Sequence, residues 1–149
     1  MSFALKKVVL DTNTLISAAI NPSSMSGLVY KHGLAYCDLY CSEETFDELA
    51  VVLERPFMDR YFQTDAPQTR AAFLARYADA AARVQVSKVT TRCIDPKDNK
   101  FLSLVETIGA DYLVSGNTKH LNILLTHEGT PILTNRQFLL EVTPAWLPN

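Results

Sequence analysis

The chain has 149 residues, which fits one domain of ordinary size, and 48% of them are apolar, enough to form a single core. The formal net charge of −2 argues against a tight nucleic-acid binder, because such proteins are usually strongly basic. An enzyme that holds RNA mainly through metal ions does not need a basic surface. No apolar run approaches the roughly 20 residues that cross a bilayer, and the first residues lack the apolar segment of a signal peptide, so we expect a cytoplasmic protein with no membrane contact.

The first half of the chain alternates strand and helix signals. The apolar run Val8–Leu10 stops at Asp11 and predicts a buried strand over residues 6–10, followed by helices over 12–20 and 27–35. A second strand is expected over 38–41. Ser42 then has the character of a helix N-cap, which predicts a helix that reaches about Glu54.

In the second half, residues 69–83 are rich in alanine and predict a helix, begun by a cap at Asp65. Alternating polarity over 84–89 indicates a short strand. Asp95 followed by Pro96 predicts the start of a helix that ends at Gly109. The remaining expected elements are strands over 111–114 and 131–133, a short helix over 118–125, and a helix over 135–142 capped by Thr134.

This alternation predicts an α/β fold with a central parallel sheet and right-handed crossovers. We expect one domain over residues 1–142 and a C-terminal tail over 143–149. Three cysteines, Cys37, Cys41 and Cys93, are too few and too irregularly spaced for a disulfide framework or a zinc site. We expect them to be buried, reduced thiols.

Four oxygen-bearing side chains fall where the predicted strands end or the following helices begin. Asp11 closes the first strand, and Glu48 lies in the helix after the second. Asp98 lies at the start of a helix, and Asn117 follows the strand over 111–114. Because the carboxyl ends of parallel strands share one edge of the sheet, these side chains should converge there.

Clustered carboxylates repel one another, and a divalent cation removes that repulsion. Oxygen ligands without histidine or cysteine suit Mg²⁺ or Mn²⁺ better than zinc. Such ions support the hydrolysis of phosphodiesters. Each residue taken alone has a simpler explanation: Asp11 as a helix cap, Glu48 as a solvated helix residue, Asp98 as a first-turn carboxylate, and Asn117 as a turn residue. The joint placement favours a metal site.

Four segments, in order, resemble the motifs of the PIN-domain family, and within it the toxin components of bacterial toxin–antitoxin systems. They are VVLDTNTLIS at 8–17, SEETFDEL at 42–49, DPKDNKFL at 95–102 and ADYLVSGN at 110–117. The similarity spans about residues 8–140. Any one motif would be weak evidence, but the ordered set is specific.

The resemblance implies a three-layer α/β/α sandwich and a Mg²⁺- or Mn²⁺-dependent ribonuclease, commonly a homodimer or higher homo-oligomer and often inhibited by an antitoxin protein. Asp11, Glu48 and Asp98 match the metal-site residues of the family. Asn13 and Ser115 match positions that support the site by hydrogen bonding.

Asn117 departs from the family pattern, in which the fourth motif ends in Gly-Asp. An asparagine oxygen can still face a metal ion but brings no negative charge, so this position leaves open a catalytically weak or inactive protein that binds RNA or an antitoxin. A third alternative is a phosphatase with Asp11 as nucleophile. It is the least favoured, because enzymes of that type need a second aspartate where this chain has Asn13.

Basic side chains also lie near the predicted edge of the sheet, and they are Lys97, Lys100, Lys119 and His120. They could contact phosphates or form an ordinary solvated rim.

Overall fold

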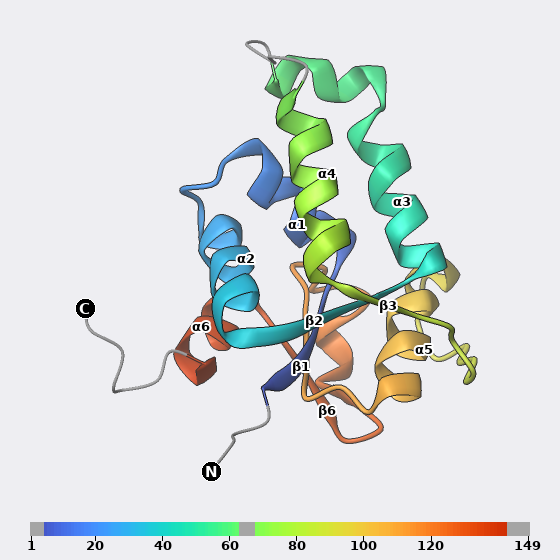
Figure 1. Ribbon diagram of the computed structural model, residues 1–149. Coiled ribbons are helices and arrows are strands. Elements are labelled where there is room, and N and C mark those ends of the chain that lie inside the picture. The colour runs from blue at the N-terminus through green and yellow to red at the C-terminus, as the bar shows by residue number, and fades with distance from the viewer. Residues whose placement is uncertain (1–4, 63–67, 143–149) are drawn as a thin grey trace.

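The computed structural model describes residues 5–62 and 68–142, so the expected tail over 143–149 and the cap at Asp65 lie outside the described residues. A six-stranded sheet in the order β3-β2-β1-β4-β6-β5 forms its centre (Figure 1). The strands are β1 (Lys6–Leu10), β2 (Cys37–Ser42), β3 (Ala82–Val84), β4 (Tyr112–Val114), β5 (Thr126–His127) and β6 (Thr130–Leu133). All neighbours pair in parallel except β5 and β6, which are antiparallel.

Helices cover both faces of this sheet, which confirms the predicted α/β/α sandwich. They are α1 (Thr12–Ile20), α2 (Met25–Tyr36), α3 (Glu43–Leu53), α4 (Gln68–Ala80), α5 (Asn99–Ile108) and α6 (Asn135–Val142), with 3-10 turns η1 (Pro56–Tyr61), η2 (Pro96–Asp98) and η3 (Asn122–Leu124). In Figure 1, α2 and α6 lie on one side of β1 and α5 lies on the other.

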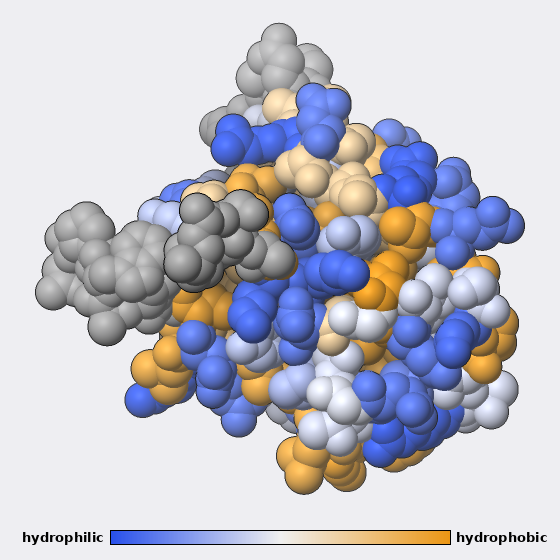
Figure 2. All heavy atoms as spheres, turned by 60° about the horizontal axis from the view of Figure 1, so that its bottom comes forward, coloured by the Kyte–Doolittle hydropathy of each residue, from blue (hydrophilic) through white to orange (hydrophobic). Residues whose placement is uncertain are grey.

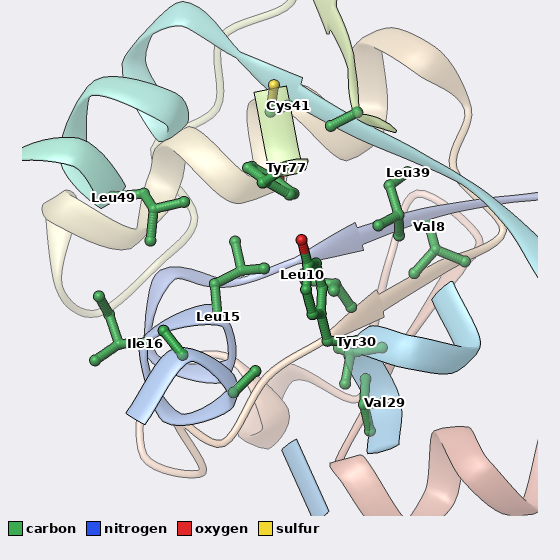
Figure 3. Close-up of a cluster of buried hydrophobic side chains, with 14 of the residues drawn as sticks. Val8, Leu10, Leu15, Ile16, Val29, Tyr30, Leu39, Cys41, Leu49 and Tyr77 are labelled. Atoms are coloured by element: carbon green, nitrogen blue, oxygen red, sulfur yellow. The ribbon is translucent and has the colours of Figure 1, made fainter. Parts of the chain in front are cut away.

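The apolar run in β1 is continuous because both of its faces are buried. Val8 and Leu10 point into a large cluster with side chains from α1, α2, α3, α4 and α6 (Figure 3). Val9 points the opposite way, into a second cluster formed mainly by α5 and β4. Successive strand residues face opposite sides, so a strand between two helical layers needs apolar residues at every position.

The register of the central strands brings their carboxyl ends together. Leu10 of β1 is paired with Val114 of β4, and the Asp11 amide donates to the Val114 carbonyl at 3.0 Å. The Ser115 amide in turn donates to the Leu133 carbonyl at the end of β6, at 2.9 Å. The residues that follow β1 and β4 therefore start from adjacent points on one edge.

Local signals place most helix ends as predicted. Ser42 caps α3 and exchanges hydrogen bonds with Thr45 in a capping box. Thr134 and Gln137 make a reciprocal pair of the same kind at the start of α6. Gly109 ends α5 with φ of 62°, a left-handed conformation that glycine adopts without steric cost.

The predicted strand over 84–89 is wrong beyond Val84. The backbone of the following segment bonds to α5 side chains instead of to a neighbouring strand. The amides of Ser87 and Lys88 donate to the Thr107 hydroxyl at 3.2 and 3.1 Å, and the Thr90 amide donates to the Ser103 hydroxyl. The alternating polarity of this segment therefore comes from its contact with α5, against which Val84 and Val86 pack, and not from pairing in the sheet.

The predicted helix over 118–125 is also wrong. The Asn117 carbonyl accepts from several following amides in a compact turn, only η3 is helical, and Leu125 has φ of 64°. The β5–β6 hairpin that follows was not predicted. Its turn, Glu128-Gly129, has positive φ at both residues, as a two-residue type I′ turn requires.

Among residues 5–62 and 68–142, no helix is both long and apolar enough to span a bilayer. Figure 2, which brings the lower side of Figure 1 forward, shows hydrophilic residues across the middle of that face with hydrophobic residues scattered among and around them.

Candidate functional site

A pocket of about 660 Å³ opens at the carboxyl edge of the sheet. It collects the segment after β1, the middle of α3, the start of α5 and the segment after β4. The side chains of all four residues singled out by their placement contribute to its wall, and so does exposed Asn13. These lining residues are Asp11, Asn13, Glu48, Asp98 and Asn117.

Asp11 both caps a helix and lines this pocket. Its Oδ1 accepts from the Thr14 amide at 2.8 Å, which caps α1, and its Oδ2 accepts from the Ser115 hydroxyl at 2.5 Å. The residue is only 3% exposed. One carboxylate thus caps α1 through Oδ1 and contacts Ser115 through Oδ2 in a residue that lines the pocket, so the capping role does not exclude the predicted site role.

Ser115 connects the two strand ends. Its buried hydroxyl donates to Asp11 and accepts from the Asn117 amide at 2.9 Å. This contact fixes the Asp11 carboxylate in position and holds the turn after β4 against it.

Glu48 is held from two sides. The Thr12 hydroxyl donates to Oε1, and the Lys100 ammonium lies 2.6 Å from Oε2. The Glu48 side chain is 31% exposed, whereas the Lys100 side chain is 8% exposed. Glu48 is thus a fixed, charge-paired side chain at the pocket wall and not a freely solvated helix residue.

Asp98 contacts Asn117 and His120. The Asn117 Nδ2 donates to Asp98 Oδ2 at 2.9 Å, while the Asn117 Oδ1 accepts from the His120 amide at 3.2 Å. This pattern fixes the orientation of the amide, because its oxygen must face the backbone N–H. Asn117 therefore presents a donor to Asp98 instead of the oxygen that was expected to face a metal ion.

Asp95, Asp98 and His120 form a group that sequence spacing did not reveal. One ligand atom from each lies within 4.8 Å of the others. His120 Nδ1 is 3.4 Å from Asp98 and 4.0 Å from Asp95. Asp95 also accepts from the Lys97 amide at 3.0 Å, as its predicted capping role requires. Nothing in the chain spacing links residue 120 to residues 95 and 98, because the turn after β4 brings it there.

The surroundings of Asp11 and Asp98 disfavour the ionised forms of these two carboxyl groups. Burial raises the pKa of Asp11 despite hydrogen bonds from Ser115 and Thr14, and the charge of Asp98 adds to the rise. Burial and the charge of Asp95 also raise the pKa of Asp98, opposed by His120 and Lys100. The pocket thus favours either protons or a cation beside these groups.

The lining of the pocket is rich in groups that can hold a divalent cation. Asp11, Glu48, Asp95 and Asp98 all line it, but among the described residues the possible ligand atoms that lie within 4.8 Å of one another belong to Asp95, Asp98 and His120, not to the predicted set of Asp11, Glu48 and Asp98. Oxygen-rich sites of this kind suit Mg²⁺ or Mn²⁺. Each carboxylate already has a protein partner, so an ion would compete with these contacts.

The basic residues near the pocket differ in how they lie. Lys97 and Lys119 line it with exposed side chains, and His120 lines it half-buried. Lys100 instead turns inward to Glu48. Thr12 also lines the pocket and donates to Glu48, and the placement of strand ends did not predict this contact. The signal available in the sequence was its position directly after Asp11.

Comparison with known proteins agrees with this architecture. The family model described as PIN domain matches residues 7–119, which is most of the chain and includes all four motifs. The chain belongs to the PIN domain family. Among curated proteins, none matches it significantly.

Two solved structures are similar to this PIN domain in fold. PAE2754 from Pyrobaculum aerophilum has a TM-score of 0.57 and 12% identity, covering 91% of this chain and 88% of that one. VapBC2 from Rickettsia felis, solved bound to a DNA fragment from their promoter, has a TM-score of 0.57 and 14% identity, covering 86% of this chain and 98% of that one.

Proposed function

We propose that this PIN domain is an endoribonuclease that hydrolyses RNA phosphodiester bonds with a bound Mg²⁺ or Mn²⁺ ion. The observation that carries the proposal is the convergence of Asp11, Glu48 and Asp98, from three distant parts of the chain, in one polar pocket. Neutral pockets for apolar ligands do not gather carboxylates in this way.

Asp11, Glu48 and Asp98 are the residues that would hold the ion. A divalent cation supplies a Lewis acid that activates water and stabilises charge on the phosphate oxygens. Ser115 orients Asp11, and Thr12 orients Glu48 through their hydroxyl groups. Lys97 and Lys119 are exposed at the rim, where cations can contact the phosphates that flank the bond to be cut.

The direct test is cleavage of a labelled single-stranded RNA across a titration of Mg²⁺ and of Mn²⁺, with and without chelator. Asp11→Asn should lose cleavage. Asp38→Asn, which makes the same change at an exposed position of β2, should cleave as the wild type does. Cleavage that persists in chelator, or in Asp11→Asn, contradicts the proposal.

We further propose that the protein is the toxin of a toxin–antitoxin pair, acting in the cytoplasm as a homodimer or higher homo-oligomer. The support is the resemblance of the four motifs to that branch of the family, together with the free, buried state of Cys37, Cys41 and Cys93. Induced expression in a bacterial host should stop growth, and Asp11→Asn should relieve the arrest. Equal growth of both strains contradicts the toxin assignment.

One observation favours the alternative of a weak or inactive, binding-only protein. Asn117 donates a hydrogen bond to Asp98 Oδ2, so it occupies an oxygen that a cation would need and, as a neutral amide, brings no negative charge of its own. The RNA titration separates the two functions, because a binding-only protein retains RNA without cutting it at any metal concentration. The aspartyl-nucleophile alternative is disfavoured, because both Asp11 oxygens are engaged and the side chain is buried.

A further inference from the structure

Lys100 is unusual among the basic residues near the pocket. Its side chain is 8% exposed, whereas Lys97 and Lys119 are exposed. An ammonium group is costly to bury unless it is paired, so a lysine in this state needs strong oxygen partners.

The partners of the Lys100 ammonium are those that a metal ion would have. Nζ lies 2.6 Å from Glu48 Oε2 and also donates to the backbone carbonyl of Lys97. The ring of Phe101 lies beneath it, with Nζ 5.5 Å from the ring centre. A carboxylate oxygen and a backbone carbonyl are typical ligands of hard cations, and here a side-chain cation occupies the place.

Lys100 is linked to two of the residues proposed to hold the ion. It follows Asp98 by two residues at the start of α5, and its ammonium pairs with Glu48 of α3 at 2.6 Å. Asn117, which contacts Asp98 Oδ2 at 2.9 Å, is a neutral amide that donates a hydrogen bond. A fixed positive charge therefore lies against Glu48, and the side chain of residue 117 adds no negative charge beside Asp98.

We propose that Lys100 is a tethered cation that takes the place of a second metal ion, so that the site binds a single divalent ion. This inference rests on the proposed metal-dependent function and deepens it. Lys100 acts as a positioning residue: it holds Glu48 Oε2 and excludes a second ion by occupying its oxygen partners.

A simple structural ion pair between α3 and α5 would also explain a buried lysine, and the number of bound ions separates the two roles. Loss of a structural ion pair lowers stability but does not change how many ions bind. Loss of a tethered cation frees oxygen ligands and removes repulsion against a divalent ion. The measurement is therefore Mn²⁺ stoichiometry and affinity, by electron paramagnetic resonance of free Mn²⁺ and by calorimetry.

The variants are Lys100→Met, Lys100→Arg and the matched control Lys31→Met, which removes the same charge from an exposed side chain of α2 that does not line the pocket. The wild type should bind one Mn²⁺ per chain. Lys100→Met should bind two, or one at least about tenfold more tightly. Lys100→Arg should keep one, and Lys31→Met should stay within about threefold of the wild-type affinity, because exposed charges are screened.

Lys100→Gln, which keeps a donor toward Glu48 without the charge, replaces Lys100→Met if that protein does not fold. Two ions in the wild type, or wild-type stoichiometry and affinity in the uncharged variants, overturn the inference and leave the proposed function standing. Absence of Mn²⁺ binding in every variant has a different meaning, since it overturns the metal-dependent function and the inference that rests on it.

Discussion

The Ser115 hydroxyl lies 2.5 Å from Asp11 Oδ2, although the two residues are 104 positions apart in the chain. Both side chains are buried, and the adjacent ends of β1 and β4 bring them together. A buried carboxylate depends on such donors, because burial favours its neutral form. This contact therefore couples the stability of the fold to the charge state of the site.

Ser115→Ala should lower the free energy of unfolding by about 2–3 kcal/mol at neutral pH, because it removes a donor to a carboxylate and an acceptor for the Asn117 amide. Ser103→Ala is a matched control, since Ser103 is also buried and, within residues 5–62 and 68–142, its hydroxyl bonds only a neutral backbone amide, that of Thr90. Urea melts in chelator measure both. A smaller loss in Ser115→Ala than in Ser103→Ala contradicts the coupling.

Asp11→Asn should make the metal-free protein more stable, and the gain should grow with pH. The pKa of Asp11 is raised in the folded state, mainly by burial, above the ordinary value of 3.8. Its stabilising contribution is therefore complete below pH 3.8 and is lost as pH rises through the folded-state pKa, by up to about 1.4 kcal/mol per pH unit. Asparagine has no titratable proton, so its contribution does not change with pH.

The measurement is the difference in free energy of unfolding between Asp11→Asn and wild type, in chelator, from pH 4 upward, at intervals of about one unit. Asp38→Asn provides the reference for general acid effects. A difference that stays constant with pH contradicts the raised pKa of Asp11. Addition of Mn²⁺ should reverse the order of stability, because only the wild type retains the full ligand set.

Glu48→Gln should reduce RNA cleavage by at least about 100-fold, since outer contacts of metal sites alone are commonly worth 10–100-fold. Glu44 lies one turn earlier on α3 and is exposed, so Glu44→Gln tests the same chemical change on the same helix. Initial rates at saturating Mn²⁺ distinguish the two. Equal rates for both variants would exclude Glu48 from the catalytic centre.

Much of the fold follows from local signals that act within a few residues. The run in β1 shows two buried faces, Ser42 shows a cap, and Gly109 shows a helix end. Local signals wrongly predict a strand after Val84, because the backbone of that segment bonds to the Ser103 and Thr107 side chains of α5 and not to a neighbouring strand. Polarity alternation does not reveal whether a strand or a helix lies alongside.

The candidate site likewise has a part that the sequence predicts and a part that only the structure reveals. The shared pocket of Asp11, Glu48 and Asp98 follows from where strands end and helices begin, because topology alone brings those points to one edge of the sheet. The inward turn of Lys100 and the approach of His120 to Asp95 depend on side-chain directions that no spacing encodes. Those directions became visible only with the packing of α3, α5 and the turn after β4.

Asn117 is the position where sequence and structure together give the sharpest prediction. Its Nδ2 donates to Asp98 Oδ2 at 2.9 Å, so an aspartate there would set two carboxylate oxygens against each other. The side chains are nearly the same size, and the pocket should tolerate the change. Without a cation the new carboxylate is repelled, and with one it becomes a charged ligand.

Asn117→Asp should therefore lower the Mg²⁺ or Mn²⁺ concentration needed for RNA cleavage by about tenfold or more, because charged oxygen ligands increase the affinity of hard cations. In chelator the same variant should be less stable than wild type, and the deficit should grow as pH rises, since ionisation of the added carboxyl group sets a second negative charge against Asp98 in the folded protein. The two effects have opposite signs, so a general change in folding cannot produce both. Cleavage across a metal titration and melts in chelator at several pH values test them side by side. A variant that matches wild type in both metal dependence and metal-free stability would show that residue 117 does not share a cation with Asp98.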